Sequence, residues 1–371
     1  MKLNYKLGEL IRNIDVKNKD LHCNNLKGLS MTKEFRASTS NIVGTDLSKY
    51  KIVAYKQFAC DFMSAIRVHK MPIAFNSEME EILVSPAYAV FEVIDENIIL
   101  PEYLMMWFRR SEFDRYADFR SDAAIRGGYG WNELCETEIK LPSLEEQRKK
   151  VQAYKTITDR IELKKKINDN LLDSVQAIFR SWFVDYDPFD GVCPSNWETG
   201  CVEDIAEFFD SMRKPLSSLE RTDMERIYPY YGAVSIVDYV DDYIFDGEYL
   251  LVSEDGIYVV DENGHPLIQH ISGKFWANNH AHILKGKSGF NEDSLYLFLA
   301  NTNMAPIVTG AAQPKINQAN LKSFPITIPD SETMLKFNNI IQPFFDQRLT
   351  NESEIKKLEA LQPLLLTRLV D

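Results

Sequence analysis

The chain has 371 residues, of which 45% are hydrophobic and 26% are charged, and its formal net charge is −13 at pH 7. This composition is typical of a soluble globular protein with two or more domains, and its acidity argues against a protein that coats nucleic acid by bulk charge. Five cysteines without a C-x-x-C pair predict reduced thiols in a cytoplasmic protein, without a disulfide framework or a zinc site, and no apolar run is long enough to span a membrane.

Residues 1–140 are predicted to form a first globular unit. Alternating and β-branched residues predict strands at 51–55, 57–60, 82–85 and 88–93. Pro101 favours the start of a short helix over 101–110, because proline fits the first turn of a helix. A glycine-rich loop that carries arginines and aromatic residues follows at 120–131.

Residues 141–187 are predicted to form one long amphipathic helix. Ser143 and Glu146 have the spacing of a capping box at its start, and Asp187-Pro188 with Gly191 indicates its end. The helical seam has coiled-coil spacing and consists of Leu171, Val175, Ile178 and Trp182. Some forty residues make a rod of roughly 60 Å. A rod of that length needs a partner helix to cover its apolar stripe.

Residues 188–329 repeat the plan of the first unit with different loops. They predict a short helix at 294–300 and strands at 248–253, 257–260, 266–271 and 280–284. The loop 309–317 occupies the position that 123–130 has in the first unit. A second long helix follows at 330–371, in which Pro343 is expected to cause a kink and Pro363 to disturb the last turns.

The chain therefore reads as a tandem duplication of a globular unit followed by a helix. The segment that leads into the first helix, from Leu134 to Ser143, is matched by Leu321 to Asp330. The ends also match, since Phe183-Val184-Asp185 corresponds to Leu369-Val370-Asp371. Internal repeats of this kind determine the architecture of the whole chain.

Several short strings, in order and in two copies, carry a resemblance to a known family. They are Leu141–Gln147 (LPSLEEQ), Ser181–Phe189 (SWFVDYDPF), Tyr230–Ala233 (YYGA), Asp246–Tyr249 (DGEY), Asn278–His282 (NNHAH), Gln313–Asn317 (QPKIN), and in the first unit Thr32–Phe35, Gly44–Tyr50 and Val84–Tyr88. Over essentially its whole length the chain resembles the specificity (S) subunit of type I restriction–modification systems.

This resemblance implies an α+β fold with two globular α/β target-recognition domains, 1–140 and 188–329. They would be separated by an antiparallel pair of long coiled-coil helices, 141–187 and 330–371, in a pseudo-twofold tandem repeat. Each domain would read one half of an asymmetric double-stranded DNA site, and the helices would set the gap and dock two methyltransferase subunits. Whether restriction subunits also bind stays open.

The resemblance also implies that the chain is not an enzyme and holds no cofactor. S-adenosylmethionine would belong to the methyltransferase partners, and ATP with Mg²⁺ to a translocating nuclease subunit. The second helix lacks the Trp-Phe pair found at Trp182 and Phe183. Its docking site is therefore expected to be the weaker one.

Basic and amide side chains in loops are the candidates for reading DNA. Arg and Lys pair with guanine, and Asn and Gln pair with adenine. The acidic net charge does not exclude local basic faces, because phosphate attraction acts within roughly 8–10 Å. The candidates are Lys33, Arg36, Arg67, Arg126, Tyr129, Arg213, Lys214, Tyr231, Lys274, Gln313, Lys315 and Asn317. The alternative for any exposed Lys or Arg is ordinary solvated surface.

Two interpretations are open for an aromatic pair and for a run of three lysines. Trp182 and Phe183 are either part of the helix-pair core or a surface that docks a methyltransferase. Lys164-Lys165-Lys166 is most simply a solvated helix face, although it could touch phosphates between the half-sites.

The motifs that would support an enzyme are weaker than those that carry the resemblance. Glu138-Ile-Lys140 and Glu354-Ile-Lys356 match half of a nuclease core, but the second falls on a predicted helix and such strings are common by chance. An adenine methyltransferase would need an N-P-P-[YF]-like loop, and Asp187-Pro188-Phe189 has only one proline. His280 and His282 alternate along a strand, and without a third ligand a structural or base-contacting role is favoured over a metal site.

A third class, a coiled-coil scaffold without a nucleic-acid role, would share the two long helices. It does not explain why the chain carries two similar units with divergent loops.

Overall fold

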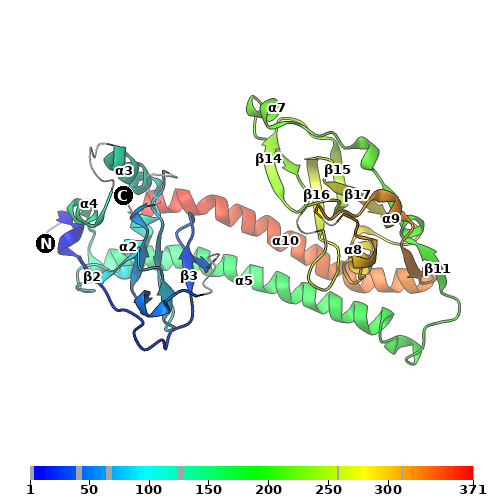
Figure 1. The fold of residues 1–371 in the computed structure, drawn as a ribbon, viewed down its shortest axis with the longest axis horizontal. Coiled ribbons are helices and arrows are strands. Elements are labelled where there is room, and N and C mark those ends of the chain that lie inside the picture. Colours follow the sequence, from blue (N-terminus) through cyan, green and yellow to red (C-terminus); the bar gives the residue numbers. More distant parts are fainter. Residues whose placement is uncertain are drawn as a thin grey trace. The chain divides into compact units, whose positions relative to one another are not determined.

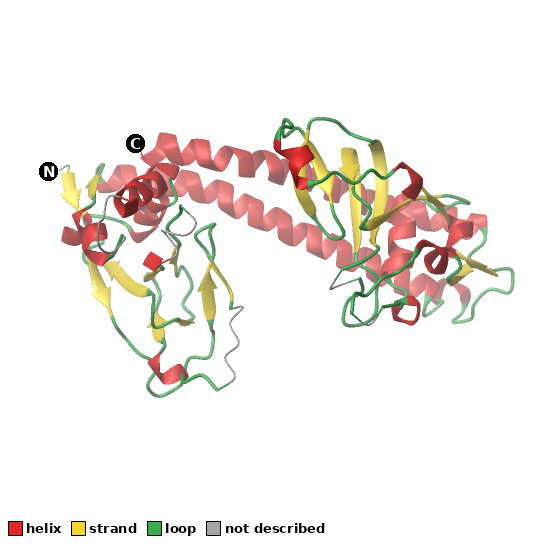
Figure 2. Cartoon of the chain, turned by 45° about the horizontal axis from the view of Figure 1, so that its top comes forward, coloured by secondary structure: helices red, strands yellow, loops and turns green. Residues whose placement is uncertain are grey.

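The computed structural model describes residues 4–38, 44–63, 69–122, 129–256, 259–310 and 312–370. Unit 1 comprises Met1–Lys164 with Glu354–Asp371, and unit 2 comprises Lys165–Ser353 (Figure 1). Both units combine helices with sheets, and two long helices each contribute one part to each unit (Figure 2). The fold is therefore α+β, as the sequence predicts.

Unit 1 is built on a four-stranded antiparallel sheet with the order β2-β9-β6-β7. Two-stranded antiparallel pairs join β1 to β10, β3 to β4, and β5 to β8. The strands are β1 (Asn4–Lys6), β2 (Ile11–Ile14), β3 (Lys27–Leu29), β4 (Phe35–Ala37), β5 (Lys51–Val53), β6 (Phe58–Cys60), β7 (Ile73–Phe75), β8 (Ile82–Val84), β9 (Ala89–Val93) and β10 (Glu138–Lys140). The helices are η1 (Leu7–Glu9), η2 (Leu47–Lys49), α2 (Pro101–Phe108), α3 (Ser111–Asp122) and α4 (Trp131–Glu136).

The core of unit 1 forms where α2 packs on the sheet. Every residue of α2 except Glu102 is buried, and a helix that is apolar all round must be enclosed. The rings of Phe58 and Phe91 stack with their centroids 4.9 Å apart, and Phe108 at the end of α2 lies 6.1 Å from each. Pro101 begins this helix, as predicted.

Unit 2 contains a six-stranded sheet with the order β12-β17-β15-β16-β13-β14, and a separate antiparallel pair of β11 with β18. Only the β13–β16 pair of the six-stranded sheet is parallel. The strands are β11 (Glu198–Cys201), β12 (Ala206–Phe208), β13 (Tyr228–Tyr231), β14 (Ile236–Val240), β15 (Phe245–Ser253), β16 (Ile268–Ala277), β17 (Ala281–Gly286) and β18 (Pro325–Ile328). The short helices are η3 (Asp187–Phe189), α6 (Val202–Ile205), η4 (Asp210–Met212), α7 (Ser218–Thr222), α8 (Glu292–Ala300), η5 (Ala305–Ile307) and α9 (Gln318–Lys322).

The two units share one plan, which confirms the internal duplication. The order β2-β9-β6-β7 of unit 1 corresponds to β12-β17-β15-β16 of unit 2, and all of these pairs are antiparallel. In each unit the strand before the long helix pairs with the first strand of the unit. The additions differ, because unit 2 extends its sheet with β13 and β14 while unit 1 adds two separate strand pairs.

The long helices are α5 (Leu144–Phe183) and α10 (Ser331–Val370), each of 40 residues. The predicted capping box is present at the start of α5: Ser143 N donates to Glu146 Oε2 at 3.0 Å, and Glu146 N donates to Ser143 Oγ at 3.3 Å. Asp330 has the equivalent place before α10 and accepts from Thr333 N at 3.1 Å. After α5 the chain turns at Tyr186, whose φ of 58° is left-handed.

The helices α5 and α10 run antiparallel within each unit. In unit 1, Arg160 and Lys164 both pair with Glu354. In unit 2, Asn351 donates to Asn168 at 2.8 Å. Further along α5, contacts move to earlier positions of α10: the rings of Phe179 and Phe337 lie 6.4 Å apart.

The seam of α5 differs from the predicted one by a small rotation. Val175 is fully buried, as expected, but Phe179 is 6% exposed while its predicted neighbours Ile178 and Trp182 are half-buried. The reason is that this part of α5 packs on the globular core of unit 2 as well as on α10. A broad apolar face suits that double contact better than a narrow coiled-coil seam.

Pro343 and Pro363 lie inside α10, which continues to Val370. The last turns are therefore helical, contrary to the expected disturbance, while the kink expected at Pro343 stays a prediction. A proline removes one backbone hydrogen bond, but Ile341 and Phe345 on either side of Pro343 are anchored in the core of unit 2. Leu366, after Pro363, is anchored in the core of unit 1 in the same way.

Two further predictions concern the strand at 257–260 and the absence of a membrane-spanning segment. The strand predicted at 257–260 falls partly outside the described residues, and Val260 makes a single bridge to Pro266. None of the helices within the described ranges is long and apolar enough to cross a membrane.

Candidate nucleic-acid interface

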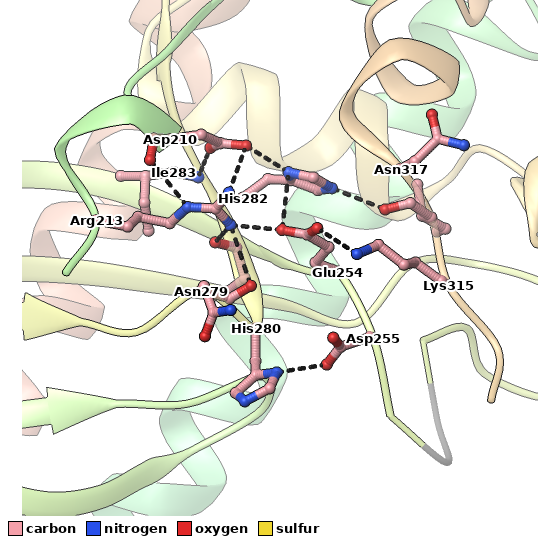
Figure 3. A network of polar contacts seen from close by, with 12 residues as sticks. Asp210, Arg213, Glu254, Asp255, Asn279, His280, His282, Ile283, Lys315 and Asn317 are labelled. Atoms are coloured by element: carbon pink, nitrogen blue, oxygen red, sulfur yellow. Dashed lines mark hydrogen bonds and ion pairs between the residues drawn. The ribbon is translucent and has the colours of Figure 1, made fainter. Parts of the chain in front are cut away.

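A polar network in unit 2 begins at the turn that follows β12 (Figure 3). Phe209 N donates to Ile283 O at 2.8 Å, which holds the chain against β17 until η4 begins. Asp210, the first residue of η4, accepts from Ile283 N at 2.8 Å. The turn therefore carries a carboxylate whose position is fixed by the sheet.

His282 on β17 is the buried centre of this network. Its side chain is 0% exposed, its Nδ1 lies 2.6 Å from Asp210 Oδ2, and its Nε2 lies 2.8 Å from Ile316 O. Burial alone would raise the pKa of Asp210, but the hydrogen bond and charge of His282 and the N–H of Ile283 hold it below its ordinary value. A carbonyl oxygen and an ionised carboxylate only accept hydrogen bonds. The ring of His282 therefore joins η4 to the segment that contains Ile316.

Glu254, which follows β15, joins two cations from distant parts of the chain. Its side chain is 12% exposed, and it accepts from Arg213 Nη1 at 2.5 Å and pairs with Lys315 Nζ at 2.9 Å. Burial alone would raise the pKa of Glu254, but the hydrogen bonds from Lys315 and Arg213 and the nearby charge of His282 hold it below its ordinary value. Glu254 is therefore ionised and binds both cations.

The loop 309–317 is tied to the same network by its backbone. Thr309 and Lys315 exchange two backbone hydrogen bonds of 2.8 Å, and Ile316 N donates to Glu254 O at 2.9 Å. Gly310 has a φ of 86°, and a Cβ there would lie 2.4 Å from Gln313 O, so the turn requires glycine. The loop is thus held at a defined place beside the end of β15.

Comparison with known proteins finds similarity to one family. The family model for the type I restriction modification DNA specificity domain matches residues 194–360, a range that includes the whole Asp210–Lys315 network. The chain is thus similar to type I specificity subunits in sequence, over part of its length, and in fold.

Two curated proteins named as specificity subunits match different lengths of the chain. A Haemophilus influenzae protein named as a type I restriction enzyme specificity subunit is 39% identical over 128 residues, which are 34% of this chain and 32% of the relative. The type I restriction enzyme MjaIX specificity subunit of Methanocaldococcus jannaschii is 24% identical over 303 residues, which are 75% of this chain and 70% of the relative. The first match thus spans about a third of its relative.

A solved structure has the same fold. The S subunit of a type I restriction–modification system from M. genitalium superposes with a TM-score of 0.57 and 12% identity. The superposition covers 99% of this chain and 96% of that one, so the specificity-subunit fold extends over both units.

Arg213 and Lys315 are the two predicted DNA contacts that the fold brings together, because Glu254 binds both. Gln313 lies exposed on the same loop as Lys315. Asn317 caps α9 by accepting from Asn320 N at 2.8 Å. Its side chain therefore has a structural task at the end of the loop.

The other candidates of unit 2 lie outside the network. Lys214 holds its ammonium 6.0 Å from the ring of Trp276, and its carbonyl accepts from Trp276 Nε1 at 2.6 Å. Tyr231 is half-buried, with its ring 5.7 Å from that of Phe275. Lys274 is exposed and its ammonium lies 4.3 Å from the ring of Tyr243. Of these three, Lys214 and Lys274 remain accessible to a ligand.

Two candidates of unit 1 are corrected by their burial. Lys33 is 4% exposed, pairs with Asp114 at 2.8 Å and donates to Phe108 O. Burial lowers the pKa of this ammonium. Tyr129 is 2% exposed, its hydroxyl lies 2.8 Å from Thr137 Oγ1, and burial raises its pKa. Both side chains are enclosed within unit 1, so neither is exposed to a DNA ligand.

Arg36 is exposed on β4, where its guanidinium donates to Leu29 O and to Ala37 O, each at 3.2 Å. Arg67 and Arg126 lie outside the described residues. As a result, the described part of unit 1 offers no cluster of predicted contacts comparable to the pair held by Glu254.

Trp182 and Phe183 pack against the core of unit 2. The ring of Phe183 lies 4.7 Å from those of Phe298 and Phe337, and Trp182 lies 5.7 Å from Phe337. These contacts support the interpretation that both side chains are part of the core. Their role in docking a methyltransferase stays a prediction.

Neither catalytic alternative gains a site among the described residues. Glu354 is on α10 and pairs with Arg160 and Lys164. Asp210, Glu254 and His282 bring ligand atoms within 4.8 Å of one another. Both carboxylates are already paired with cations, Asp210 with Arg213 and Glu254 with Arg213 and Lys315, so this group does not fit a metal ion. His280 is half-exposed and lies 2.7 Å from Asp255.

Sequence reasoning missed Asp210, Glu254 and Asp114. Each is an acidic residue whose importance comes from burial beside a cation that is far away in the sequence. The strings Asn278–His282 and Gln313–Asn317 were the available signal, and they mark the two segments that meet at Glu254.

Proposed function

We propose that this chain is the DNA sequence-recognition subunit of a type I restriction–modification complex, in which each unit reads one half of a split, asymmetric site. The observation that carries the proposal is the common sheet order of the two units combined with their different additions. One scaffold in two copies, with different surface segments on each copy, is suited to reading two different short sequences.

The basic side chains of unit 2 support a nucleic-acid ligand. Arg213 and Lys315 are held together by one carboxylate, and Lys214, Lys274 and Gln313 are exposed in the same unit. Cations attract phosphates and amides read base edges, so this set combines the two kinds of contact that a specific DNA interface needs. The negative net charge of the chain limits binding to such local sites.

In this proposal the chain itself catalyses no reaction and needs no cofactor. Two adenine methyltransferase subunits dock on the α5–α10 pair and use S-adenosylmethionine. A nuclease subunit, where one is present, uses ATP with Mg²⁺. The complex works in the cytoplasm, where chromosomal DNA is accessible.

The test is a map of adenine methylation at single-base resolution in the source organism, with and without the gene for this chain. The expected result is the loss of one motif that has two specified halves and an unspecified gap of constant length. Restoring the gene restores the motif. Loss of no motif, or loss of an uninterrupted one, would overturn the proposal.

A further inference from the structure

We propose that Glu254 is a specificity-determining positioning residue. It holds Arg213 and Lys315 in one fixed arrangement, so that unit 2 discriminates between base sequences at its DNA half-site instead of only binding DNA of any sequence. The inference rests on the proposed function of the chain.

Glu254 is the one described side chain to which both cations bind. Arg213 Nη1 reaches Oε2 at 2.5 Å, and Lys315 Nζ reaches Oε1 at 2.9 Å. Each carboxylate oxygen therefore takes one cation, and the planar carboxylate sets the separation between them. Arg213 Nη1 also donates to Ala281 O at 2.7 Å, which leaves the guanidinium little freedom to rotate.

The backbone of Glu254 adds to this arrangement. Its N–H donates to His280 O at 2.9 Å, and its carbonyl accepts from Ile316 N at 2.9 Å. His282 then holds Ile316 O from the other side at 2.8 Å. Glu254 and His282 thus tie the loop 309–317 to the strands β15 and β17, and the two cations are presented from a rigid base.

A held cation and a free cation bind DNA differently. A free lysine follows phosphates on any sequence, so it adds affinity without adding discrimination. A cation with a fixed position contributes to discrimination, because a mismatched base leaves its hydrogen bond unmade. Removing the charge of Glu254 should therefore increase non-specific affinity and reduce specificity at one half-site.

The experiment replaces the chromosomal gene with Glu254→Gln, which keeps the size of the side chain and removes its charge. Adenine methylation is then mapped across the genome. The expected result is that methylation spreads to sites that deviate in one half of the motif, with discrimination at one or two base pairs reduced about 5- to 150-fold. The other half of the motif and the gap stay unchanged.

The matched control is Glu262→Gln, which removes the same charge from an exposed position of the same unit. It should reproduce the wild-type motif. A second readout is binding of the purified full chain to a random-sequence duplex of fixed length at several salt concentrations. Release of Lys315 should steepen the slope of log K against log salt by about 0.9. A defect that only weakens folding would lower methylation at all sites and would not steepen this slope.

The outcomes separate this inference from the proposed function. If the wild-type gene restores a split motif and Glu254→Gln restores the same motif with the same tolerance, Glu254 has no positioning role and only the inference fails. If the wild-type gene restores no split motif, the proposed function fails and the inference fails with it. If Glu254→Gln does not fold, as judged by circular dichroism, Lys315→Met decides in its place. That variant keeps the backbone links of Ile316, and an unchanged motif overturns the inference.

Discussion

Asn351 on α10 donates from Nδ2 to Oδ1 of Asn168 on α5 at 2.8 Å, and both side chains are buried. Gln347 donates to Oδ1 of Asn351 at 3.0 Å, which completes a small amide network inside the helix pair. A buried polar pair on facing helices favours a single register, because any slip leaves the amides unpaired. This contact therefore fixes the register of α5 and α10 within unit 2.

Asn351→Leu should destabilise the chain by about 1–3 kcal/mol, because the amide of Asn168 is left buried without its partner. The double replacement Asn168→Leu with Asn351→Leu should recover most of that loss, since both polar groups are then gone. Urea unfolding of the four proteins in a double-mutant cycle measures the coupling. Additive losses in the cycle would mean that the pair does not fix the register.

Lys33→Met should lower the stability of unit 1 and leave DNA binding intact in the folded protein. The ammonium of Lys33 is buried beside Asp114 at 2.8 Å, and its removal leaves a carboxylate without its cation. Breaking a buried pair costs about 3–5 kcal/mol, and the bond from Met71 N to Asp114 at 3.0 Å places the expected loss near the lower end.

The control for Lys33 is Lys49→Met, which removes an exposed lysine from the same unit. It should change the free energy of unfolding by less than about 0.5 kcal/mol. Equal losses for the two variants, measured by urea unfolding, would contradict the structural role of Lys33.

The sequence predicted those features that depend on local periodicity. The long helices α5 and α10 follow from apolar side chains at helical spacing, and the capping box at Ser143 follows from two residues three positions apart. The duplication was visible because the segments around β10 and β18 are similar strings. Each of these signals lies within one stretch of the chain.

The site could be predicted only in part, because burial depends on contacts between distant segments. Lys33 and Arg213 look alike in the sequence as basic residues near turns. The structure buries Lys33 against Asp114, and it holds Arg213, whose side chain is 13% exposed, between Asp210 and Glu254. Glu254 has no local signal, since its partners arrive from before β13 and after α8.

The pH dependence of the free energy of unfolding should reveal two buried titratable groups of unit 2, Asp293 and His270. Burial, with the charges of Glu248 and Asp346, raises the pKa of Asp293 from 3.8 to about 7. Burial, with the charge of Arg348, lowers the pKa of His270 from 6.5 to about 4. Stability from neutral Asp293 is present at low pH and is lost as the pH rises towards 7. Stability from neutral His270 is present above pH 6.5 and is lost as the pH falls towards 4.

The two effects oppose each other in the wild-type protein, so its stability should change little between about pH 4 and 6.5. Asp293→Asn removes the first effect. In that variant stability should rise with pH over this window by on the order of 3 kcal/mol. Urea unfolding at several pH values measures the slope, with Glu262→Gln as an exposed control. A flat profile for Asp293→Asn would contradict the assignment of His270 as a neutral buried ring.

Gly310→Ala should disturb the loop that carries Lys315. Gly310 has a φ of 86°, and an added Cβ would lie 2.4 Å from Gln313 O. Gly191 is the matched control, because its φ is 74° but a Cβ there would meet none of the described atoms within 4 Å. Both replacements incur the cost of a left-handed backbone, about 1 kcal/mol. Only Gly310→Ala adds a clash, which can be relieved by opening the Thr309–Lys315 hairpin.

We therefore expect Gly310→Ala to lower the free energy of unfolding in urea more than Gly191→Ala does. We also expect relaxed recognition that is confined to the half-site that Glu254→Gln affects. Equal stability losses with an unchanged methylation motif would mean that the loop 309–317 does not contact DNA.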